Sequence, residues 1–461
     1  MDYANPNATF DHNDIFERKR YAIQAMKWID AYPVKEQGYS LVIDAPWGVG
    51  KTTFLNMWKF DIKRAHPEYK KEHPDTKPIF SVAKREVVYY NAWENDRSED
   101  PFAPLLWTII STLTMDKYPD PKIQVSGDAI YDAINALAVA IATMNPSNLA
   151  LQSVPTIMKS VKHLSEIFSR GQDTPVSKIV AAMNEQHTTR AALRKALTDL
   201  ARACGTLFIM VDELDRCRPS FAIETLEAIY QYFGLPNIVF IFSVDMTQLS
   251  HVIGGRYGVG FDAGGYANKF FTRTLRLPTP SAQQMIIFAD QNTNLHLACK
   301  DELECQEEFE LVFQACGITP REIPMLYHEL SSYFTPQPMG YYHDKLRSDL
   351  ALFILAVLCM KYRMPESYKA FLRGEADIGV QRLSAIPHLS HVITSFLPYM
   401  RKTYAECYEE WHPHWAAYRN ASQDEDLMSE SLFPSVAYAI LSKLKQTDKA
   451  NFGQMLFYYF T

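Results

Sequence analysis

The sequence lacks the features of a secreted, disulfide-bonded or membrane protein. Its seven cysteines are odd in number and include no Cys-x-x-Cys pair, so neither a disulfide framework nor a zinc ribbon is indicated. Residues 1–14 have no basic flank and no apolar run, which argues against a signal peptide. The nearest candidates for a membrane helix, 133–144 and 350–360, fall short of the about 18 apolar residues required. We therefore expect a cytoplasmic protein without transmembrane anchoring.

An excess of basic residues is also missing. The 46 Lys and Arg against 53 Asp and Glu give a net charge of −7, which does not favour general binding to a phosphate backbone. Contact with nucleic acid would need a local basic patch. With 18 Gly and 26 Pro in 461 residues, collagen-like and low-complexity architectures are excluded. A hydrophobic content of 47% indicates a folded globular chain, and its length indicates two or three structural units.

Five apolar runs have the length and composition of buried strands, and helical patterns separate them. Such near-continuous apolar strands are typical of a parallel sheet that is covered by helices on both faces. We therefore expect a three-layer α/β core with a parallel sheet. The predicted strands span residues 39–45, 86–91, 206–211, 237–244 and 273–277.

Two further regions have helical patterns and no convincing strand. Residues 110–203 are rich in Ala, Ser and Thr and predict a helical insertion between the second and third strands. Residues 281–461 predict an all-α carboxy-terminal domain, which leaves 1–109 and 204–280 as the α/β core. The predicted helices of the insertion are 129–144, 157–168 and 179–203, and those of the carboxy-terminal domain are 283–297, 307–316, 321–334, 345–361 and 434–444.

The sharpest motif is Ala45-Pro-Trp-Gly-Val-Gly-Lys-Thr52, between the first strand and a helix. It matches the phosphate-loop spacing G-x-x-x-x-G-K-[ST] except at its first position, where alanine keeps a small side chain. The glycines let backbone N–H groups approach phosphates, the lysine reaches the β- and γ-phosphates, and the threonine hydroxyl holds Mg²⁺. ATP and Mg²⁺ are therefore the expected cofactors. The predicted nucleotide-binding residues are Trp47, Gly48, Val49, Gly50, Lys51, Thr52 and Thr53.

The third strand runs directly into two acids, Asp212 and Glu213. A strand-end pair of this kind supplies one carboxylate for Mg²⁺ and a second to orient or activate water. We expect Asp212, with Thr52, to hold the metal and Glu213 to act on water. The acid pair favours a hydrolase over a kinase, with Lys51, Asp212 and Glu213 as catalytic residues.

Asp215 and Arg216 follow this acid pair and begin the turn into a helix. Two interpretations are open for them. Arg216 would stabilise phosphate charge at the site of a neighbouring subunit, or the two residues would form an Asp–Arg pair that caps the helix.

The whole series of segments resembles the KAP family of P-loop NTPases, from about residue 11 to residue 330. The phosphate loop is followed in the family's order by VVYYNAWE, VDELDRCRPSFAIETLEAI, VFIFSVDMTQL and YGVGFDAGGYANKFFTRTLRLP. Asn91-Ala-Trp93 and the block from Tyr266 to Pro278 are more diagnostic than the phosphate loop itself. The resemblance implies an ASCE-type nucleotide-binding core, related to the STAND and AAA+ groups, in which ATP binding or turnover drives assembly.

The resemblance also implies a biological setting. Bacterial members of the family are associated with exclusion of phage and with defence islands. Many members carry transmembrane helices in an insertion between the phosphate loop and the acidic strand. Residues 110–203 occupy that place without a stretch of membrane length, which departs from the pattern of those members.

Five more positions are implied by the resemblance. Ser243 and Asp245 end the fourth strand, where the wider group places a polar sensor near the γ-phosphate; a strand-end Asp also caps the next helix. Lys269 and Arg273 lie where AAA+ proteins project a cation to the adjacent subunit, with an ordinary surface cation as the alternative. Arg321 is the candidate for a second sensor arginine, or else an ordinary charge at a helix start.

Together these features predict an ATP-binding and hydrolysing subunit whose nucleotide state controls a larger assembly. We expect a homo-oligomer that acts with a separate effector protein, since no nuclease, deaminase or protease constellation is present in the sequence. The first alternative is an ATP-gated scaffold with negligible turnover. The second is a nucleic-acid-associated motor, which the charge balance does not favour.

Overall fold

The structure, a computed structural model, describes residues 8–117, 129–144, 190–293, 302–332 and 344–397, apart from isolated positions within these ranges. The chain forms two compact units, residues 1–279 and 280–461. The first is an α/β unit and contains the predicted phosphate loop. The predicted helices 157–168 and 434–444 lie outside the described residues.

A parallel sheet of five strands forms the centre of the first unit, in the order β2-β3-β4-β1-β5. Each strand coincides with one of the predicted apolar runs to within a residue or two, so the predicted fold class is confirmed. The observed bounds are Tyr39–Asp44 for β1, Glu86–Asn91 for β2, Leu207–Asp212 for β3, Ile238–Val244 for β4 and Arg273–Arg276 for β5.

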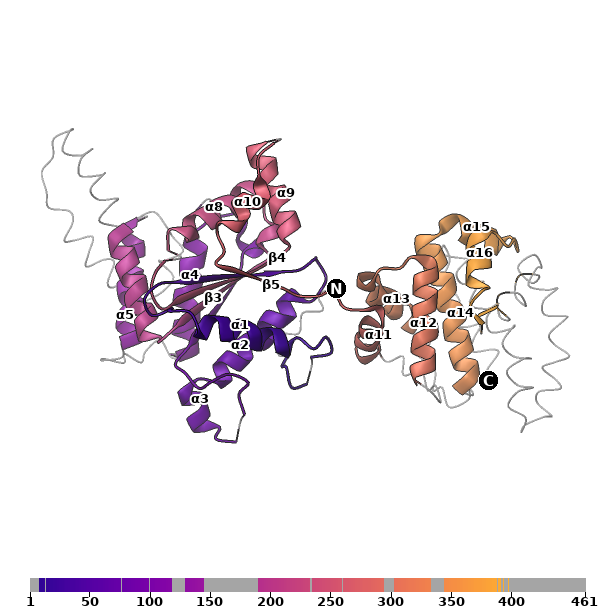
Figure 1. Ribbon diagram of the computed structural model, residues 1–461, viewed down its shortest axis with the longest axis horizontal. Helices are drawn as coiled ribbons and strands as arrows, with labels where there is room; N and C mark the ends of the chain where they lie inside the picture. Colours follow the sequence, from indigo (N-terminus) through magenta and orange to yellow (C-terminus); the bar gives the residue numbers. More distant parts are fainter. Residues whose placement is uncertain are drawn as a thin grey trace, which may run out of the picture. The chain divides into compact units, whose positions relative to one another are not determined.

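The strands are apolar almost throughout because helices cover both faces of the sheet. Along β1, Leu41 and Ile43 pack in one hydrophobic cluster, whereas Val42 packs in the other, as the two-residue period of a strand requires. Figure 1 shows α1 (Lys19–Asp30) and α2 (Lys51–Arg64) on one face, and α8 (Pro219–Tyr230) and α9 (Met246–Tyr257) on the other. The first unit therefore has three layers.

The helices between β2 and β3 pack on the same face of the sheet as α8. They are α4 (Ala103–Lys117), α5 (Ala129–Met144), which has the predicted bounds, and helical residues 190–203. Leu105, Leu137 and Leu200 are fully buried in one cluster with the strands. This part of the chain therefore contributes to the core of the α/β unit. Among the described residues, no helix is long and apolar enough to cross a membrane.

The described residues of the second unit form helices and no strand. Residues 351–360 of α14 are all buried, so this helix forms the centre of the unit. Arg363, at the end of α14, pairs with Glu322 at 2.5 Å. The helices are α11 (Ala282–Gln291), α12 (Glu302–Cys316), η4 (Pro320–Glu322), α13 (Ile323–Ser331), α14 (Asp344–Arg363), α15 (Pro365–Leu372) and α16 (Ile378–Leu383).

The register of the sheet brings the polar strand ends into one row. Asn91 of β2 is opposite Asp212 of β3, which is opposite Ser243 of β4, and Ser243 is opposite Ile43 of β1. In open parallel α/β sheets, ligands bind outside the carboxyl ends of the strands. This edge is where the predicted phosphate loop leaves β1.

Candidate nucleotide-binding site

The phosphate loop connects the end of β1 to the first residue of α2, Lys51. Gly48 and Gly50 have φ angles of 82° and 86°, a left-handed conformation that glycine adopts without steric cost. Between them, Val49 is buried. A turn of this kind before a helix directs successive N–H groups to one side and adds the positive end of the helix dipole. The loop therefore has the backbone of an anion-binding site.

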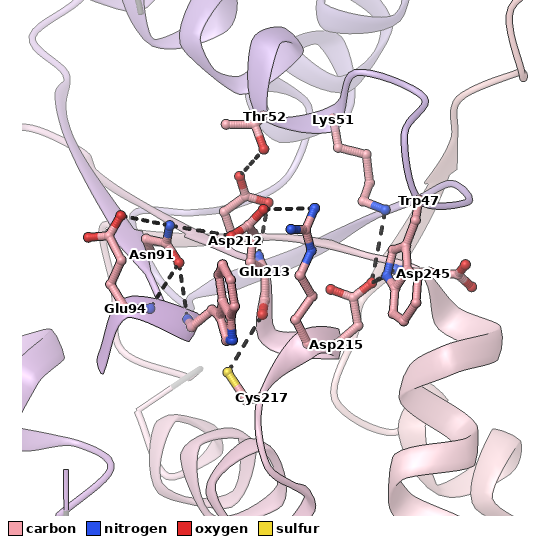
Figure 2. A network of polar contacts seen from close by, with 12 residues as sticks. Trp47, Lys51, Thr52, Asn91, Glu94, Asp212, Glu213, Asp215, Cys217 and Asp245 are labelled. Atoms are coloured by element: carbon pink, nitrogen blue, oxygen red, sulfur yellow. Dashed lines mark hydrogen bonds and ion pairs between the residues drawn. The ribbon is translucent and has the colours of Figure 1, made fainter. Parts of the chain in front are cut away.

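Lys51 folds back over the loop. Its Nζ donates to the carbonyl oxygens of Ala45 at 2.6 Å and Pro46 at 3.3 Å, and it lies 4.0 Å from Oδ2 of Asp215 (Figure 2). Burial lowers the pKa of Lys51, while the negative charge of Asp215 acts in the opposite direction. Its two hydrogen bonds are therefore to neutral carbonyl oxygens, and phosphate oxygens are stronger acceptors for an ammonium group than carbonyls are.

Thr52 and Asp212 meet across the gap between α2 and β3. The hydroxyl of Thr52 donates to Oδ2 of Asp212 at 2.7 Å (Figure 2), and the hydroxyl of Tyr89 donates to the same oxygen at 3.0 Å. The other carboxylate oxygen accepts the N–H of Glu213 at 3.0 Å. A threonine hydroxyl beside a buried carboxylate is the oxygen donor set that Mg²⁺ takes together with phosphates. The residues present therefore fit Mg²⁺.

Glu213 projects from the strand end with a left-handed backbone, at φ 60°. Its Oε1 pairs with Nη2 of Arg216 at 3.0 Å, and the amide of Asn91 donates to its Oε2 at 3.5 Å. Burial raises the pKa of Glu213, and the charge of Arg216 opposes that shift. Both carboxylate oxygens are therefore held by neighbouring side chains on the side of the sheet where the loop lies.

Asp215 does not form the Asp–Arg helix cap that was one interpretation of the sequence. Its Oδ2 accepts Nε1 of Trp47 at 2.7 Å and the N–H of Asp245 at 2.7 Å. Arg216 pairs with Glu213 instead, and α8 begins after Arg218 without a side-chain cap. The capping interpretation is wrong because the buried Asp215 faces the phosphate loop and the end of β4, where it meets donors distant in sequence.

Asp245 caps α9. Its Oδ1 accepts the N–H groups of Thr247 at 3.0 Å and Gln248 at 3.2 Å. Ser243, two residues earlier, is fully buried, and its hydroxyl has no hydrogen-bond partner among the described residues. Of the two candidate sensor residues, Asp245 thus stabilises the start of α9 as its N-cap, while Ser243 lies opposite Asp212 in the sheet register.

The two predicted cations lie at the opposite end of β5 from the phosphate loop. Arg273 is paired with Leu41, three residues before Asp44, which is roughly 10 Å along the strands. Its guanidinium lies 4.6 Å from the ring centre of Trp28, and the exposed Lys269 lies 5.8 Å from that of Tyr266. Neither reaches the loop of its own subunit, so their donation to a neighbour stays a prediction.

Sequence reasoning missed several residues at the loop end of the sheet. Arg276 ends β5, is exposed and lies 3.7 Å from Asp44. Tyr89 lies two residues before Asn91 and faces Asp212, and the two-residue period of β2 was the available signal.

The two remaining predicted site residues are Thr53 and Arg321. Thr53 follows Thr52 in α2 and is half-buried. Arg321 lies in η4 of the second unit, and its sensor role stays a prediction.

A parallel β2-β3-β4-β1-β5 sheet, with a glycine-rich loop after β1 and an acid pair after β3, defines a nucleotide-binding P-loop NTPase. Residues 18–335 match the KAP family P-loop domain, and the chain belongs to this family.

A solved structure described as "Structure of the Aeropyrum Pernix ORC2 protein (ADPNP-ADP complexes)" is 13% identical, with 95% of this chain and 96% of that chain covered. Its TM-score is 0.34, a level of similarity that carries no functional argument. No curated protein matches the chain.

Proposed function

We propose that the protein is an Mg²⁺-dependent ATPase. The proposal depends on one observation above all: the hydroxyl of Thr52 and the carboxylate of Asp212 meet at 2.7 Å, although 160 residues separate them. Loop, metal donors and a second acid are therefore assembled at one end of the sheet. Family membership supports the same class of activity.

Each residue has a distinct part in this proposal. The loop from Trp47 to Thr53 holds the phosphates, with Lys51 supplying positive charge. Thr52 and Asp212 hold Mg²⁺, and Glu213 accepts a proton from water or orients it. Bound Mg²⁺–ATP supplies the reactive phosphoryl group and a cation that offsets its charge.

The experiment compares three substitutions in purified protein. Lys51→Ala is expected to abolish ATP binding or turnover, and Asp212→Ala to remove Mg²⁺-dependent binding. Glu213→Gln is expected to keep ATP bound and slow hydrolysis by about 10²-fold or more. Glu224→Gln, an exposed acid on α8, is the control for loss of a carboxylate. If Asp212→Ala and Glu213→Gln weaken ATP binding equally, the proposed division of roles is incorrect.

One observation favours a second candidate, an ATP-gated scaffold with negligible turnover. Both oxygens of Glu213 are engaged, one by Arg216 and one by Asn91. A carboxylate held in this way has fewer acceptor sites left for water. Steady-state phosphate release separates the two candidates: a scaffold gives the same negligible rate in the wild type and in Glu213→Gln, with ATP bound in both.

We further propose that nucleotide state controls a homo-oligomer that acts with a separate effector in bacterial antiphage defence, in the cytoplasm. Family membership supports this setting. Two measurements test it. The mass in solution should rise with ATP in the wild type but not in Lys51→Ala. Cells that carry the gene with its neighbours should resist phage, and the same substitution should abolish resistance. Equal masses and equal phage yields would argue against the proposed role.

A further inference from the structure

Arg18 is a buried arginine that joins two distant parts of the first unit. It precedes α1, is 3% exposed, and its Nη2 donates to the carbonyl of Val49 at 3.3 Å and to that of Pro278 at 2.8 Å. The first carbonyl belongs to the phosphate loop. The second follows β5, at the last residues of the first unit.

The chain before α1 is built to place this side chain. The carboxylate of Asp14 accepts the N–H groups of Arg18 at 2.5 Å and Lys19 at 2.7 Å, which fixes the start of the helix. Glu17 has a φ of 53°, an uncommon left-handed conformation for a residue other than glycine. Backbone strain of this kind persists only where surrounding contacts enforce it.

The burial of Arg18 carries an energetic cost. Its Nε and Nη1 are buried and have no hydrogen-bond partner among the described residues. Burial lowers the pKa of Arg18 to about 10. Buried donors without partners are rare in native proteins and call for an explanation. An apolar side chain would avoid the cost of desolvation, but it would lose both carbonyl contacts and the contact of the guanidinium with Phe16, whose ring centre lies 5.7 Å away.

The contact with Val49 controls the orientation of one peptide group in the phosphate loop. A trans peptide is planar, so its C=O and N–H point in opposite directions. When Arg18 holds the carbonyl of Val49, the N–H of Gly50 is aimed away from Arg18. Gly50, at φ 86°, also tolerates negative φ, so the peptide would otherwise turn over at little cost.

We propose that Arg18 is a positioning residue that keeps the N–H of Gly50 directed at the phosphates and couples the loop to the end of β5 through Pro278. The inference deepens the proposed nucleotide-binding function and depends on it. Coupling between two sites is reciprocal. Bound nucleotide therefore restrains the segment around Pro278, and displacement of this segment weakens nucleotide binding.

The test compares Arg18→Met and Arg18→Lys with Arg20→Met. Arg20 lies two residues further along the chain, is exposed, and contacts neither Val49 nor Pro278. Its guanidinium pairs with Glu17 at 3.8 Å and lies 5.1 Å from the ring centre of Tyr21, so its substitution is the matched control. Affinity is measured with a fluorescent ATP analogue. Amide hydrogen exchange is measured for residues 45–55 and 272–279 in nucleotide-free and ATP-bound protein.

Arg18→Met is expected to weaken binding of the analogue by about 10- to 100-fold, the worth of one charge-assisted hydrogen bond to phosphate. Exchange should rise in both segments at once in the nucleotide-free protein. The ammonium of Arg18→Lys lies one bond closer to the backbone than Nη2, the atom that makes both carbonyl contacts, so these contacts lengthen and at least one segment should exchange faster. Arg20→Met should match the wild type in every measurement.

Wild-type affinity in folded Arg18→Met, or faster exchange in only one segment of that variant, would overturn the proposal. If Arg18→Met does not fold, Arg18→Lys decides, because wild-type exchange in both segments would overturn it as well. A wild-type protein that binds no ATP analogue would refute the proposed function. The exchange experiment in the nucleotide-free protein would still determine whether Arg18 couples the two segments.

Discussion

At the end of β3, two neighbouring effects shift the pKa of Glu213 in opposite directions. Burial in the site raises its pKa, and the guanidinium of Arg216 at 3.0 Å opposes that rise. A carboxylate that accepts a proton from water must be ionised, so activity is lost as the pH falls through its pKa. Arg216 therefore extends activity toward lower pH, although it also occupies one carboxylate oxygen.

We predict that Arg216→Ala moves the acid limb of the pH–rate profile to higher pH, because the influence that lowers the pKa of Glu213 is removed. Turnover at the pH optimum should rise, since Oε1 is released. The measurement is kcat/KM against pH, with Arg218→Ala as the control because Arg218 pairs with Asp96 instead. A fall of about 10³-fold with an unshifted acid limb would instead identify Arg216 as a cation that acts on phosphate.

Asp61, on α2, is a fully buried acid whose pKa is raised to about 6, chiefly by burial. Its Oδ2 has no hydrogen-bond partner among the described residues. In the unfolded chain the same group has a pKa of about 3.9. Between these values the folded protein binds more protons than the unfolded chain, so stability falls as the pH rises through this interval.

We predict that Asp61→Asn raises the free energy of unfolding by about 1–3 kcal/mol at pH 7 and that the gain vanishes below about pH 4. Asp11, which shares Arg64 with Asp61, is the matched control, because its pKa is lowered, chiefly by its hydrogen bond from Arg64. Asp11→Asn should therefore cost stability at neutral pH and have no effect at low pH. Urea unfolding at several pH values measures both, and a gain for Asp61→Asn that does not change with pH would contradict the argument.

At the scale of elements, the start of α9 combines a structural and a candidate functional residue. Asp245 accepts two N–H groups of the first turn, and its own N–H donates to Asp215, which faces Lys51. The helix cap and the phosphate loop are thus connected through one buried carboxylate. A substitution of Asp245 therefore tests whether its side chain only stabilises the start of α9 or also affects the nucleotide-binding site.

We predict that Asp245→Ala lowers the free energy of unfolding by about 1 kcal/mol, the usual worth of an N-cap. Asp245→Ser should restore most of it, because a serine hydroxyl also accepts the N–H of the first turn. If Asp245 only caps the helix, Asp245→Ser should keep the wild-type ATPase rate. Equal loss of turnover in both variants, with stability restored only by serine, would establish the sensor role implied by the family resemblance.

At the scale of the whole molecule, the charge on the γ-phosphate is met incompletely by one subunit. Lys51 is the cation of the loop, and Arg216 is paired with Glu213. Lys269 and Arg273 lie at the far end of β5, whereas the exposed Arg276 lies at the loop end, beside Asp44. A neighbouring subunit is therefore the expected source of a further cation.

We predict that the active unit is an oligomer in which Lys269, Arg273 or Arg276 acts across the subunit boundary. An added cation is typically worth about 10³–10⁵ in rate, so alanine at the acting position should abolish turnover but spare ATP binding. Mixing that variant with inactive Lys51→Ala should restore part of the activity, since some boundaries then pair an intact loop with an intact cation. The other two alanine variants are internal controls. Absence of rescue at every ratio, with a monomeric mass in saturating ATP, would contradict the prediction.

The sequence by itself determined the strands, the phosphate loop and the acid pair, because each depends on residues close together in the chain. An apolar run bounded by turn residues defines a strand, and Gly48, Gly50 and Lys51 define the loop without any distant contact. The segment order was also readable, and it carried the resemblance to the KAP family that the comparison confirmed over residues 18–335.

Only the tertiary structure decided which of these groups touch. The partners of Asp215, the contact of Tyr89 with Asp212 and the place of Arg276 follow from the strand order and register of the sheet. Arg18 meets Pro278 across 260 residues of sequence. No local pattern encodes such pairs, because a side chain's neighbours in a parallel sheet come from strands that crossovers bring together, and a shift in register would exchange them all.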